Sequence, residues 1–204
     1  MSDAATIELF FDVGSPYSHL AFTQLARIRE QTGAELRLRP FLLGAVLKES
    51  GNDIPARVPS KARYMLRDLQ RWAARYGVPF RMNSRFPLNT LSAQRALVAA
   101  ERLFGAEAME RLARGLFRAM WAEDRDVSSG DEIALAANEA GLDAGRIAQA
   151  VSTQEVKDAL RETTAEALRR GAFGAPTFFV GDEMYFGNDR IDLLVDELRA
   201  KNPA

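Results

Sequence analysis

The 204-residue sequence contains no cysteine and only one histidine, His19. Without cysteine, the chain itself can form no disulfide, no thiolate nucleophile and no zinc–thiolate site. A single histidine also makes a multi-histidine metal site or an ordinary Ser-His catalytic pair hard to build. We therefore expect no metal site, and any sulfur chemistry must use a thiol from another molecule.

The chain also lacks an excess of charge of one sign and a long hydrophobic run. Its formal net charge is -1, with acidic and basic residues interspersed, which argues against a nucleic-acid partner. The most apolar internal run, "FLLGAVLK", is too short to span a bilayer, and "MSDAATIELFF" at the N-terminus has no secretory signal pattern. We expect a soluble, cytoplasmic protein that does not bind membranes.

The first 40 residues predict a strand, a helix and a second strand. "TIELFFDV" (6–13) is rich in β-branched and aromatic residues and ends at Gly14. Pro16 suits the first turn of a helix that an apolar stripe continues as far as Gly33. "AELRLRP" (34–40) alternates apolar and charged residues, as a half-exposed strand does. The order is βαβ.

Between residues 44 and 171 the sequence predicts helices and no convincing strand. Apolar residues recur at helical spacing in two sets, Met65, Leu69, Trp72 and Tyr76, and Ala93, Leu97, Ala100 and Phe104. Ser129 with Glu132 and Ser152 with Glu155 have capping-box spacing, and Gly141 and Gly171 suit helix ends. Residues 173–187 then predict two strands joined at Gly181-Asp182, followed by an amphipathic helix with Ile191, Leu194, Val195 and Leu198.

Two short motifs could carry chemistry. In "GSPYS", Ser15 precedes a helix, where backbone N–H groups and the helix dipole favour an anion, although a serine there is also a good N-cap. In "FGAPTFFV", Pro176 precedes an apolar strand; its peptide bond could be cis, but these residues alone favour trans.

Taken together, the two motifs are typical of a thioredoxin-like fold. That α/β fold has a βαβ half and a ββα half, and it sets a Cys-x-x-Cys motif at a helix start opposite a cis-proline loop. "SPYS" occupies the first place and Pro176 the second. A large all-helical insertion between the halves resembles the DsbA-like branch. We predict a thioredoxin-like domain from residues 1–43 and 172–204, with residues 44–171 as an inserted helical domain.

Five blocks of sequence, in order, resemble the 2-hydroxychromene-2-carboxylate isomerase and kappa-class glutathione transferase family; they are "FFDVGSPYSHLAF", "LRPFLLGAVLKESGN", "PSKARYMLRDLQRWAARYGVP", "GAFGAPTFFV" and "FGNDRIDLL". The resemblance implies glutathione as cofactor, a small aromatic substrate and a homodimer. It also implies cis–trans isomerisation of an aromatic ring-cleavage intermediate, 2-hydroxychromene-2-carboxylate to trans-o-hydroxybenzylidenepyruvate or a close analogue. The alternatives are a kappa-like transferase and a glutathione-binding thioredoxin relative without turnover.

By position, the resemblance makes Ser15 the residue that holds the glutathione sulfur. The backbone of Ala175, before Pro176, would pair with the cysteinyl part of glutathione. Tyr17 and His19 could face the substrate or could simply pack.

Four further positions match residues that hold the two ends of glutathione. Asn52 and Lys61 would reach the tripeptide from the helical unit, and Asn188 with Asp189 would hold the γ-glutamyl end. Taken locally, Asn52 could be a turn residue, Lys61 a solvated lysine and Asp189 a helix cap.

Overall fold

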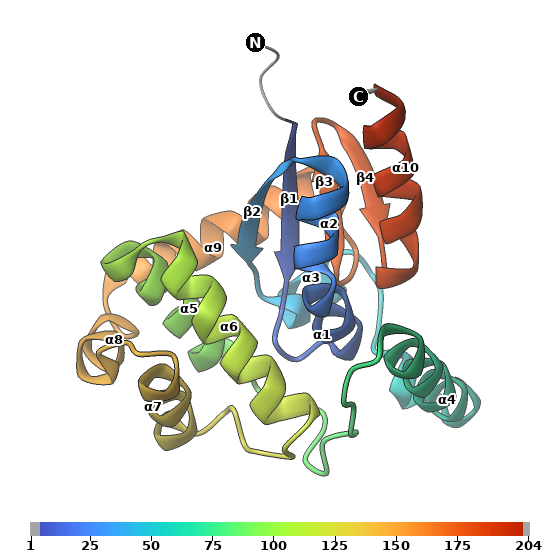
Figure 1. The fold of residues 1–204 in the computed structure, drawn as a ribbon. Helices are drawn as coiled ribbons and strands as arrows, with labels where there is room; N and C mark the ends of the chain where they lie inside the picture. The colour runs from blue at the N-terminus through green and yellow to red at the C-terminus, as the bar shows by residue number, and fades with distance from the viewer. Residues whose placement is uncertain (1–4, 202–204) are drawn as a thin grey trace.

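The computed structural model describes residues 5–201 of the chain (Figure 1). In chain order its elements are β1 (Thr6–Phe11), α1 (Pro16–Thr23), α2 (Leu25–Thr32), β2 (Glu35–Pro40), α3 (Leu43–Glu49), the 3-10 helix η1 (Pro55–Arg57), α4 (Pro59–Tyr76), α5 (Leu91–Phe104), α6 (Ala106–Trp121), α7 (Gly130–Glu139), α8 (Ala144–Ala150), α9 (Gln154–Arg169), β3 (Thr177–Val180), β4 (Glu183–Phe186), the 3-10 helix η2 (Asn188–Arg190) and α10 (Ile191–Lys201).

The four strands form one mixed sheet in the order β2-β1-β3-β4. β1 pairs in parallel with β2 and antiparallel with β3, so Leu9 stands opposite Leu38 on one side and Phe178 on the other. β3 and β4 form a hairpin in which Val180 pairs with Glu183, and Gly181 in the turn has a φ of 59°. The predicted βαβ and ββα halves therefore meet along β1 and β3.

Helices cover both faces of the sheet (Figure 1). Side chains alternate along a strand, so β1 contributes to both cores. On one face, Leu9 belongs to the same buried cluster as Leu25 of α2 and Leu194 of α10. On the other, Phe10 packs in a cluster with Ala167 of α9. The end of β1 that leads to Ser15 is thus fixed from both sides.

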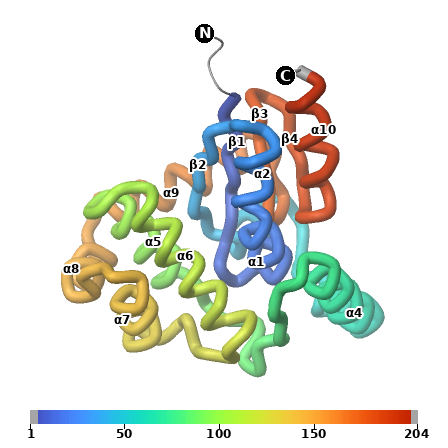
Figure 2. Tube along the Cα trace, in the orientation of Figure 1, coloured from blue at the N-terminus to red at the C-terminus, as the bar shows by residue number. Residues whose placement is uncertain are grey.

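Residues 44–171 contain no strand, as predicted. In Figures 1 and 2, α5 to α8 lie to one side of α1 and α4 lies to the other. Leu97 and Met109 of these helices belong to the same buried cluster as Ile7 of the sheet. Because the sheet and the helices share this core, the division of the chain at residues 44 and 171 stays a prediction. No helix in the described part of the chain has both the length and the apolar character that a membrane span requires.

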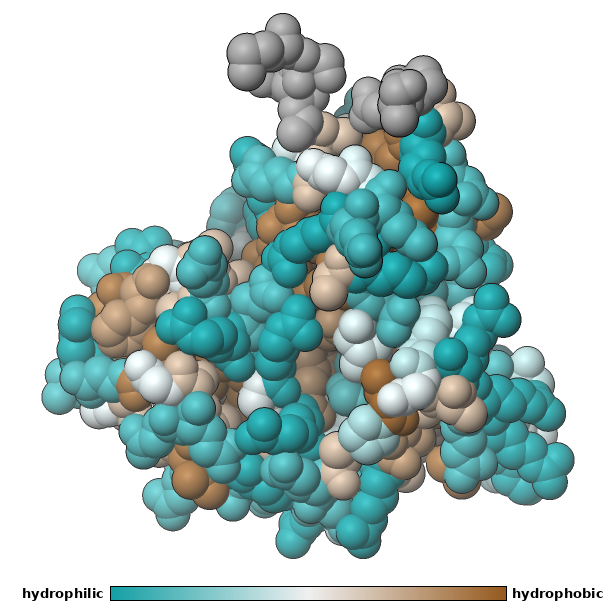
Figure 3. All heavy atoms as spheres, in the orientation of Figure 1, coloured by the Kyte–Doolittle hydropathy of each residue, from teal (hydrophilic) through white to brown (hydrophobic). Residues whose placement is uncertain are grey.

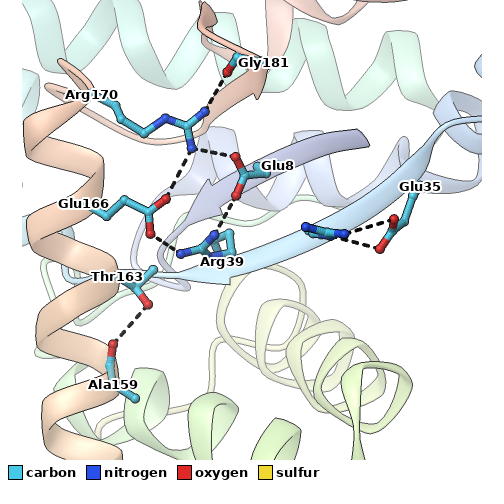
Figure 4. A network of polar contacts seen from close by, with 9 residues as sticks. Glu8, Glu35, Arg39, Ala159, Thr163, Glu166, Arg170 and Gly181 are labelled. Carbon is cyan, nitrogen blue, oxygen red and sulfur yellow. Dashed lines mark hydrogen bonds and ion pairs between the residues drawn. The ribbon is translucent and has the colours of Figure 1, made fainter. Parts of the chain in front are cut away.

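An arginine–glutamate network ties α9 to the sheet and to the β3–β4 hairpin (Figure 4). Arg39 of β2 pairs with Glu8 of β1 and with Glu166 of α9. Arg170 pairs with Glu8 at 2.6 Å and with Glu166 at 3.4 Å, and it donates to the carbonyl oxygen of Gly181 at 2.8 Å. Charge-assisted hydrogen bonds therefore attach the C-terminal end of α9 to β1, to β2 and to the turn between β3 and β4.

The segment predicted as one helix from Pro16 to Gly33 is two helices that meet at Gln24. The Thr23 hydroxyl donates to the carbonyl of Leu20 at 2.6 Å, which is the acceptor that the Gln24 N–H would use in a continuous helix. The Gln24 N–H bonds instead to the carbonyl of Ala21, at 3.0 Å. This local competition ends α1 at Thr23 and leaves one residue, Gln24, between α1 and α2.

The predicted helix ends are partly right. Gly141 and Gly171 have φ values of 71° and 90° just beyond α7 and α9. Ser129 occupies the N-cap of α7, but its side chain makes no capping bond. The capping role predicted for Ser152 belongs to Thr153, whose hydroxyl accepts from the backbone N–H of Val156.

Candidate active site

Ser15 sits at the N-cap of α1, directly after the loop that leaves β1. Its Oγ accepts a hydrogen bond from the backbone N–H of Ser18 at 3.1 Å and donates one to the carbonyl oxygen of Ala175 at 3.0 Å. The residue is only 3% exposed. The N-cap interpretation is therefore correct, but it is incomplete, because the same hydroxyl also reaches a residue 160 positions away in the chain.

A buried carboxylate, Asp12, organises the loop that presents Ser15. It accepts from the backbone N–H of Gly14 at 2.8 Å, from that of Leu43 at 2.8 Å and from the hydroxyl of Thr90 at 2.7 Å. Its own carbonyl accepts from the N–H of Ser15 at 2.9 Å. Burial raises the pKa of Asp12, and the three donors act in the opposite direction. One carboxylate thus connects β1 to the starts of α1, α3 and α5.

Ala175 lies beside Ser15 and lines the cavity, and Pro176 follows it just outside the lining. The Ala175-Pro176 peptide bond is cis, so the preference for trans drawn from the local residues is wrong. The carbonyl of Pro176 accepts from the N–H of Gly187 at 2.9 Å, which fixes the loop to the end of β4. Within residues 5–201, the N–H of Ala175 donates to no protein acceptor. The backbone N–H of Ala175 is therefore free to donate, whereas its carbonyl oxygen already accepts from Ser15.

A cavity of about 350 Å³ opens beside this pair of residues. Its lining combines polar groups of the β1–α1 loop with mostly apolar side chains from α3, α4 and the loop before α5. The lining residues are Asp12, Gly14, Ser15, Pro16, Tyr17, Leu43, Gly44, Leu47, Asn52, Asp53, Ile54, Pro55, Met65, Phe86, Pro87, Leu88, Thr90, Gly174, Ala175 and Phe186. An apolar cavity with a few polar groups at one end is the usual form of a small-molecule site.

Aromatic rings border the cavity at Gly174. The Phe186 ring lies 4.5 Å from that of Phe173, measured between centroids, and both residues are more than a third exposed. A Cβ added to Gly174 would stand 2.6 Å from the Phe186 ring. Glycine at position 174 is what lets this ring reach the cavity.

Of the predicted site residues, Ser15, Tyr17, Asn52 and Ala175 line the cavity, and Lys61 does not. Lys61 lines an adjoining hollow that shares Tyr17 with the cavity. The Asn52 side chain donates to the carbonyl of Phe173 at 3.0 Å. Asn52 therefore connects the segment after α3 to the loop that carries Ala175.

Tyr17 connects the start of α1 to α4. Its hydroxyl donates to Asp68 at 3.0 Å. Burial, followed by the hydrogen bond to Asp68, raises the pKa of Tyr17, and the more distant charge of Asp189 acts in the same direction. The phenol is therefore protonated at neutral pH and can donate, but it cannot act as a base.

Asn188 and Asp189 lie beyond the cavity lining, in η2. Asn188 is buried, and its carbonyl accepts from the hydroxyl of Tyr76 at 3.2 Å. Asp189 is exposed and pairs with Arg190 at 2.7 Å. The N-cap of η2 is Gly187, so the helix-cap interpretation of Asp189 is wrong.

His19 is not brought to the cavity. It lies one helical turn after Ser15, with Nε2 3.4 Å from the carbonyl oxygen of Pro79. Burial lowers the pKa of His19 to about 4, against the weaker opposing effect of that carbonyl. The imidazole is neutral at pH 7 and lines a separate cavity.

The model of the DSBA-like thioredoxin domain family matches residues 6–199 of this sequence. The chain belongs to this family. The DsbA-like protein is 37% identical over 200 residues to glutathione S-transferase kappa 1 of Rattus norvegicus, with 92% of this chain and 88% of the rat protein covered. It is 32% identical over 191 residues to 2-hydroxychromene-2-carboxylate isomerase of Sphingobium xenophagum, with 93% of this chain and 95% of the relative covered.

A solved structure of 2-hydroxychromene-2-carboxylate isomerase superposes on the DsbA-like protein with a TM-score of 0.86 at 29% identity, covering 96% of this chain and 95% of the other. The resemblance drawn from the five sequence blocks and the thioredoxin-like fold class are both confirmed.

Sequence reasoning missed several residues that build the site of this DsbA-like protein. Asp12 could have been noticed as an acid at the end of a buried strand, where functional side chains often gather. Thr90 and Asp68 carry no comparable local signal, because their partners lie 78 and 51 residues away.

Proposed function

We propose that this protein is a glutathione-dependent cis–trans isomerase of an aromatic ring-cleavage intermediate, 2-hydroxychromene-2-carboxylate or a close analogue. The observation that carries the proposal is the Ser15 hydroxyl, held at the start of α1 against the carbonyl of Ala175 at one end of an apolar cavity. In a chain without cysteine, this hydroxyl is suited to hold a thiol that arrives with a ligand. The 32% identity to a protein named for that isomerisation supports the assignment.

The residues around the cavity fit a tripeptide thiol. The unused N–H of Ala175 can pair with a peptide carbonyl, as a strand edge does. Lys61 in the adjoining hollow suits a carboxylate, and Asp189, near Tyr17, suits an ammonium group. Asn52 and Asn188 would complete the two ends of the site, with Pro176 holding Ala175 in place.

When bound, glutathione supplies a thiolate that can add to a carbon–carbon double bond and leave again after rotation about it. The protein's task is to favour that thiolate at neutral pH. The Ser15 hydroxyl has one proton, which it now donates to Ala175. To donate to sulfur, the hydroxyl must turn away from Ala175, whose carbonyl then accepts from an N–H of the ligand. The Ser18 N–H continues to polarise the Ser15 oxygen, which strengthens the hydroxyl as a donor.

The free energy needed to lower the pKa of the bound thiol is modest. A free thiol has a pKa of about 8.5, and lowering it by about two units requires roughly 2.7 kcal/mol. A charge-assisted hydrogen bond contributes about 1.5–3 kcal/mol, and a helix N-terminus adds about 0.3–1 kcal/mol. Ser15 at the start of α1 can therefore supply most of the shift.

Ser15→Ala tests this role directly. The variant should still bind glutathione, but the pKa of the bound thiol should rise by about one to two units. Activity at neutral pH should fall about ten- to a hundredfold and recover partly at higher pH. Titration of the thiolate's ultraviolet absorbance measures the shift. Ser18→Ala is the matched control, since the Ser18 hydroxyl is buried and has no partner within residues 5–201. An unchanged thiol pKa in Ser15→Ala would leave Ser15 as a helix cap only.

A kappa-like glutathione transferase is the second candidate, favoured by the 37% identity to the rat kappa protein. Incubation of the protein with glutathione and 2-hydroxychromene-2-carboxylate separates the candidates. Isomerised substrate with no glutathione consumed supports the isomerase, and a thioether conjugate supports the transferase. Unchanged substrate together with a thermal shift by glutathione would indicate a binding protein without turnover.

We also propose a homodimer, on the strength of the family resemblance. Sedimentation equilibrium should give twice the mass of the 22.6 kDa chain.

A further inference from the structure

A second cavity, of about 440 Å³, lies further along α1, beside its C-terminal half. It is bounded by α1, by the Val78-Pro79 segment after α4, by α6 and by the end of α7. It shares no lining residue with the cavity at Ser15. In Figure 3, drawn in the orientation of Figure 1, hydrophobic spheres are set among hydrophilic ones in the region where α1 and α6 face each other.

The floor of this cavity is apolar and aromatic. The rings of Phe22 and Phe117 lie 5.0 Å apart between centroids, and each residue is 2% exposed. Val78 and Pro79 line the same space. The two rings are already buried, so a flat apolar molecule that contacts their edges would remove from water mainly its own surface and that of Val78 and Pro79.

Three arginines stand along the rim, at positions 111, 114 and 118 of α6. Residues three and four apart share a helix face, so these guanidinium groups follow one edge of the cavity. Arg114 is paired with Glu110 at 2.6 Å, and Arg118 with Glu139 at 2.7 Å. These two arginines are therefore neutralised by the protein.

Arg111 differs from its two neighbours on the rim. Its Nε donates to the carbonyl of Ala140 at 3.3 Å, and no carboxylate of residues 5–201 pairs with it. The two terminal nitrogens of its guanidinium keep their donors for an anion, in the fork geometry that matches a carboxylate. Glu139, the one acid in the lining, is held by Arg118 and by Arg125.

His19 is an independent sign that a polar ligand belongs in this cavity. It lines the space, is only 6% exposed, and has an Nδ1 with no hydrogen-bond partner within residues 5–201. With Nε2–H directed to Pro79, Nδ1 is an acceptor that lacks a donor. A buried acceptor without a partner is unfavourable, and a turn of the imidazole toward the cavity would let a hydroxyl on a bound ligand supply the missing donor.

We propose that this cavity is a second binding site, which takes a small hydroxylated aromatic carboxylate. The ring of the ligand lies on Phe22 and Phe117, its carboxylate pairs with Arg111, and its hydroxyl donates to His19. The proposal does not depend on glutathione binding at Ser15.

Calorimetric titration with 6-hydroxy-2-naphthoate tests the site in the full chain. We expect one binding event in the wild type, weakened about tenfold or more in Arg111→Met, which keeps the apolar stem and removes the fork. Arg102→Met, at an exposed arginine of α5, is the matched control and should bind as the wild type does. Replacing the probe by 2-naphthol, which lacks the carboxylate, should weaken binding to the wild type by a similar factor and leave little difference between wild type and Arg111→Met.

A second variant shows which cavity the probe uses. Leu47→Trp narrows the cavity at Ser15, where Leu47 is a lining residue, and should leave the affinity for 6-hydroxy-2-naphthoate unchanged. Equal affinity in Arg111→Met and the wild type, loss of binding in Leu47→Trp, or no binding at millimolar probe would each overturn the proposal. Because Arg111 is exposed, its variant should melt at the wild-type temperature, so weaker binding cannot be attributed to unfolding.

Discussion

A fall in pH from 7.5 to 5 should weaken the fold through one identifiable group, His19. It is the only histidine in the chain, and burial lowers its pKa to about 4 in the folded protein. In the unfolded chain the pKa of histidine is about 6.5. Between these two values the unfolded state binds a proton that the folded state does not, so the free energy of unfolding falls as pH falls.

The size of the effect follows from the two pKa values. At pH 5 the unfolded imidazole is almost fully protonated, whereas the folded one, with a pKa of about 4, is mostly neutral. Because proton binding is linked to unfolding, His19 lowers the free energy of unfolding by about 2 kcal/mol between pH 7.5 and pH 5. The contribution of His19 to the free energy of unfolding is fully present above about pH 6.5 and is lost as the pH falls toward 4.

Urea unfolding of the wild type and of His19→Phe at pH 7.5 and 5.0 measures this contribution. Phenylalanine keeps an aromatic ring beside Phe117, whose ring lies 5.9 Å from the imidazole, and it does not titrate. Carboxylates titrate in both proteins, so their contribution cancels in the comparison. Arg111, Arg114 and Glu139, the charged residues that line the same cavity together with Arg118, are present in both proteins. Between pH 7.5 and 5.0 the free energy of unfolding of the wild type should fall by about 2 kcal/mol more than that of His19→Phe.

Proton NMR provides the decisive control, since a single histidine gives a single ring resonance of each type. That resonance should keep the same chemical shift from pH 7.5 to 5.5 in the folded protein. A midpoint near 6.5, or an equal loss of stability in wild type and His19→Phe, would refute the reasoning.

Three further substitutions have distinct expected outcomes. Asp12→Asn should lower the free energy of unfolding by about 1–3 kcal/mol in urea, because an amide cannot accept from all three donors. Gly174→Ala should push the Phe186 ring aside and weaken glutathione binding in calorimetry while changing stability by less than about 1 kcal/mol; unchanged affinity would remove that ring from the site. Arg170→Met should cost about 2 kcal/mol in urea unfolding, whereas Arg161→Met, at an exposed ion pair, should cost less than about 1 kcal/mol. Equal losses for the two arginines would contradict a special role for the network.

The order of strands and helices could be predicted because hydrophobic spacing is a local property. Met65 and Leu69, for example, are both buried on one face of α4, as their spacing indicates. The break at Gln24 could not be read in this way, since it depends on whether the Thr23 hydroxyl takes a particular carbonyl. The same holds for the cap of α9, where Ser152 and Thr153 are chemically equivalent candidates.

The candidate site was predictable where a motif marks it and not where the fold assembles it. "GSPYS" and "GAPT" locate Ser15 and Ala175, and the structure joins them by a hydrogen bond. The partners of Asp12 come from three separate elements, and no spacing in the sequence relates them. His19 follows Ser15 by four residues, yet it lines a different cavity, because α6 and the Val78-Pro79 segment pack around this part of α1.

The pairing of β1 with β3 determines when this molecule can be completed. Ile7 stands opposite Val180, so β1 gains its second neighbouring strand from a segment that is made long after β1 itself. Until then a nascent chain has half a sheet, and the edge of β1 that β3 will cover is open to other strands. Ser15 is made 160 residues before Ala175, whose carbonyl accepts its hydrogen bond. The protein must therefore keep this edge of β1 unpaired, or shielded by a chaperone, until the residues of β3 have been made.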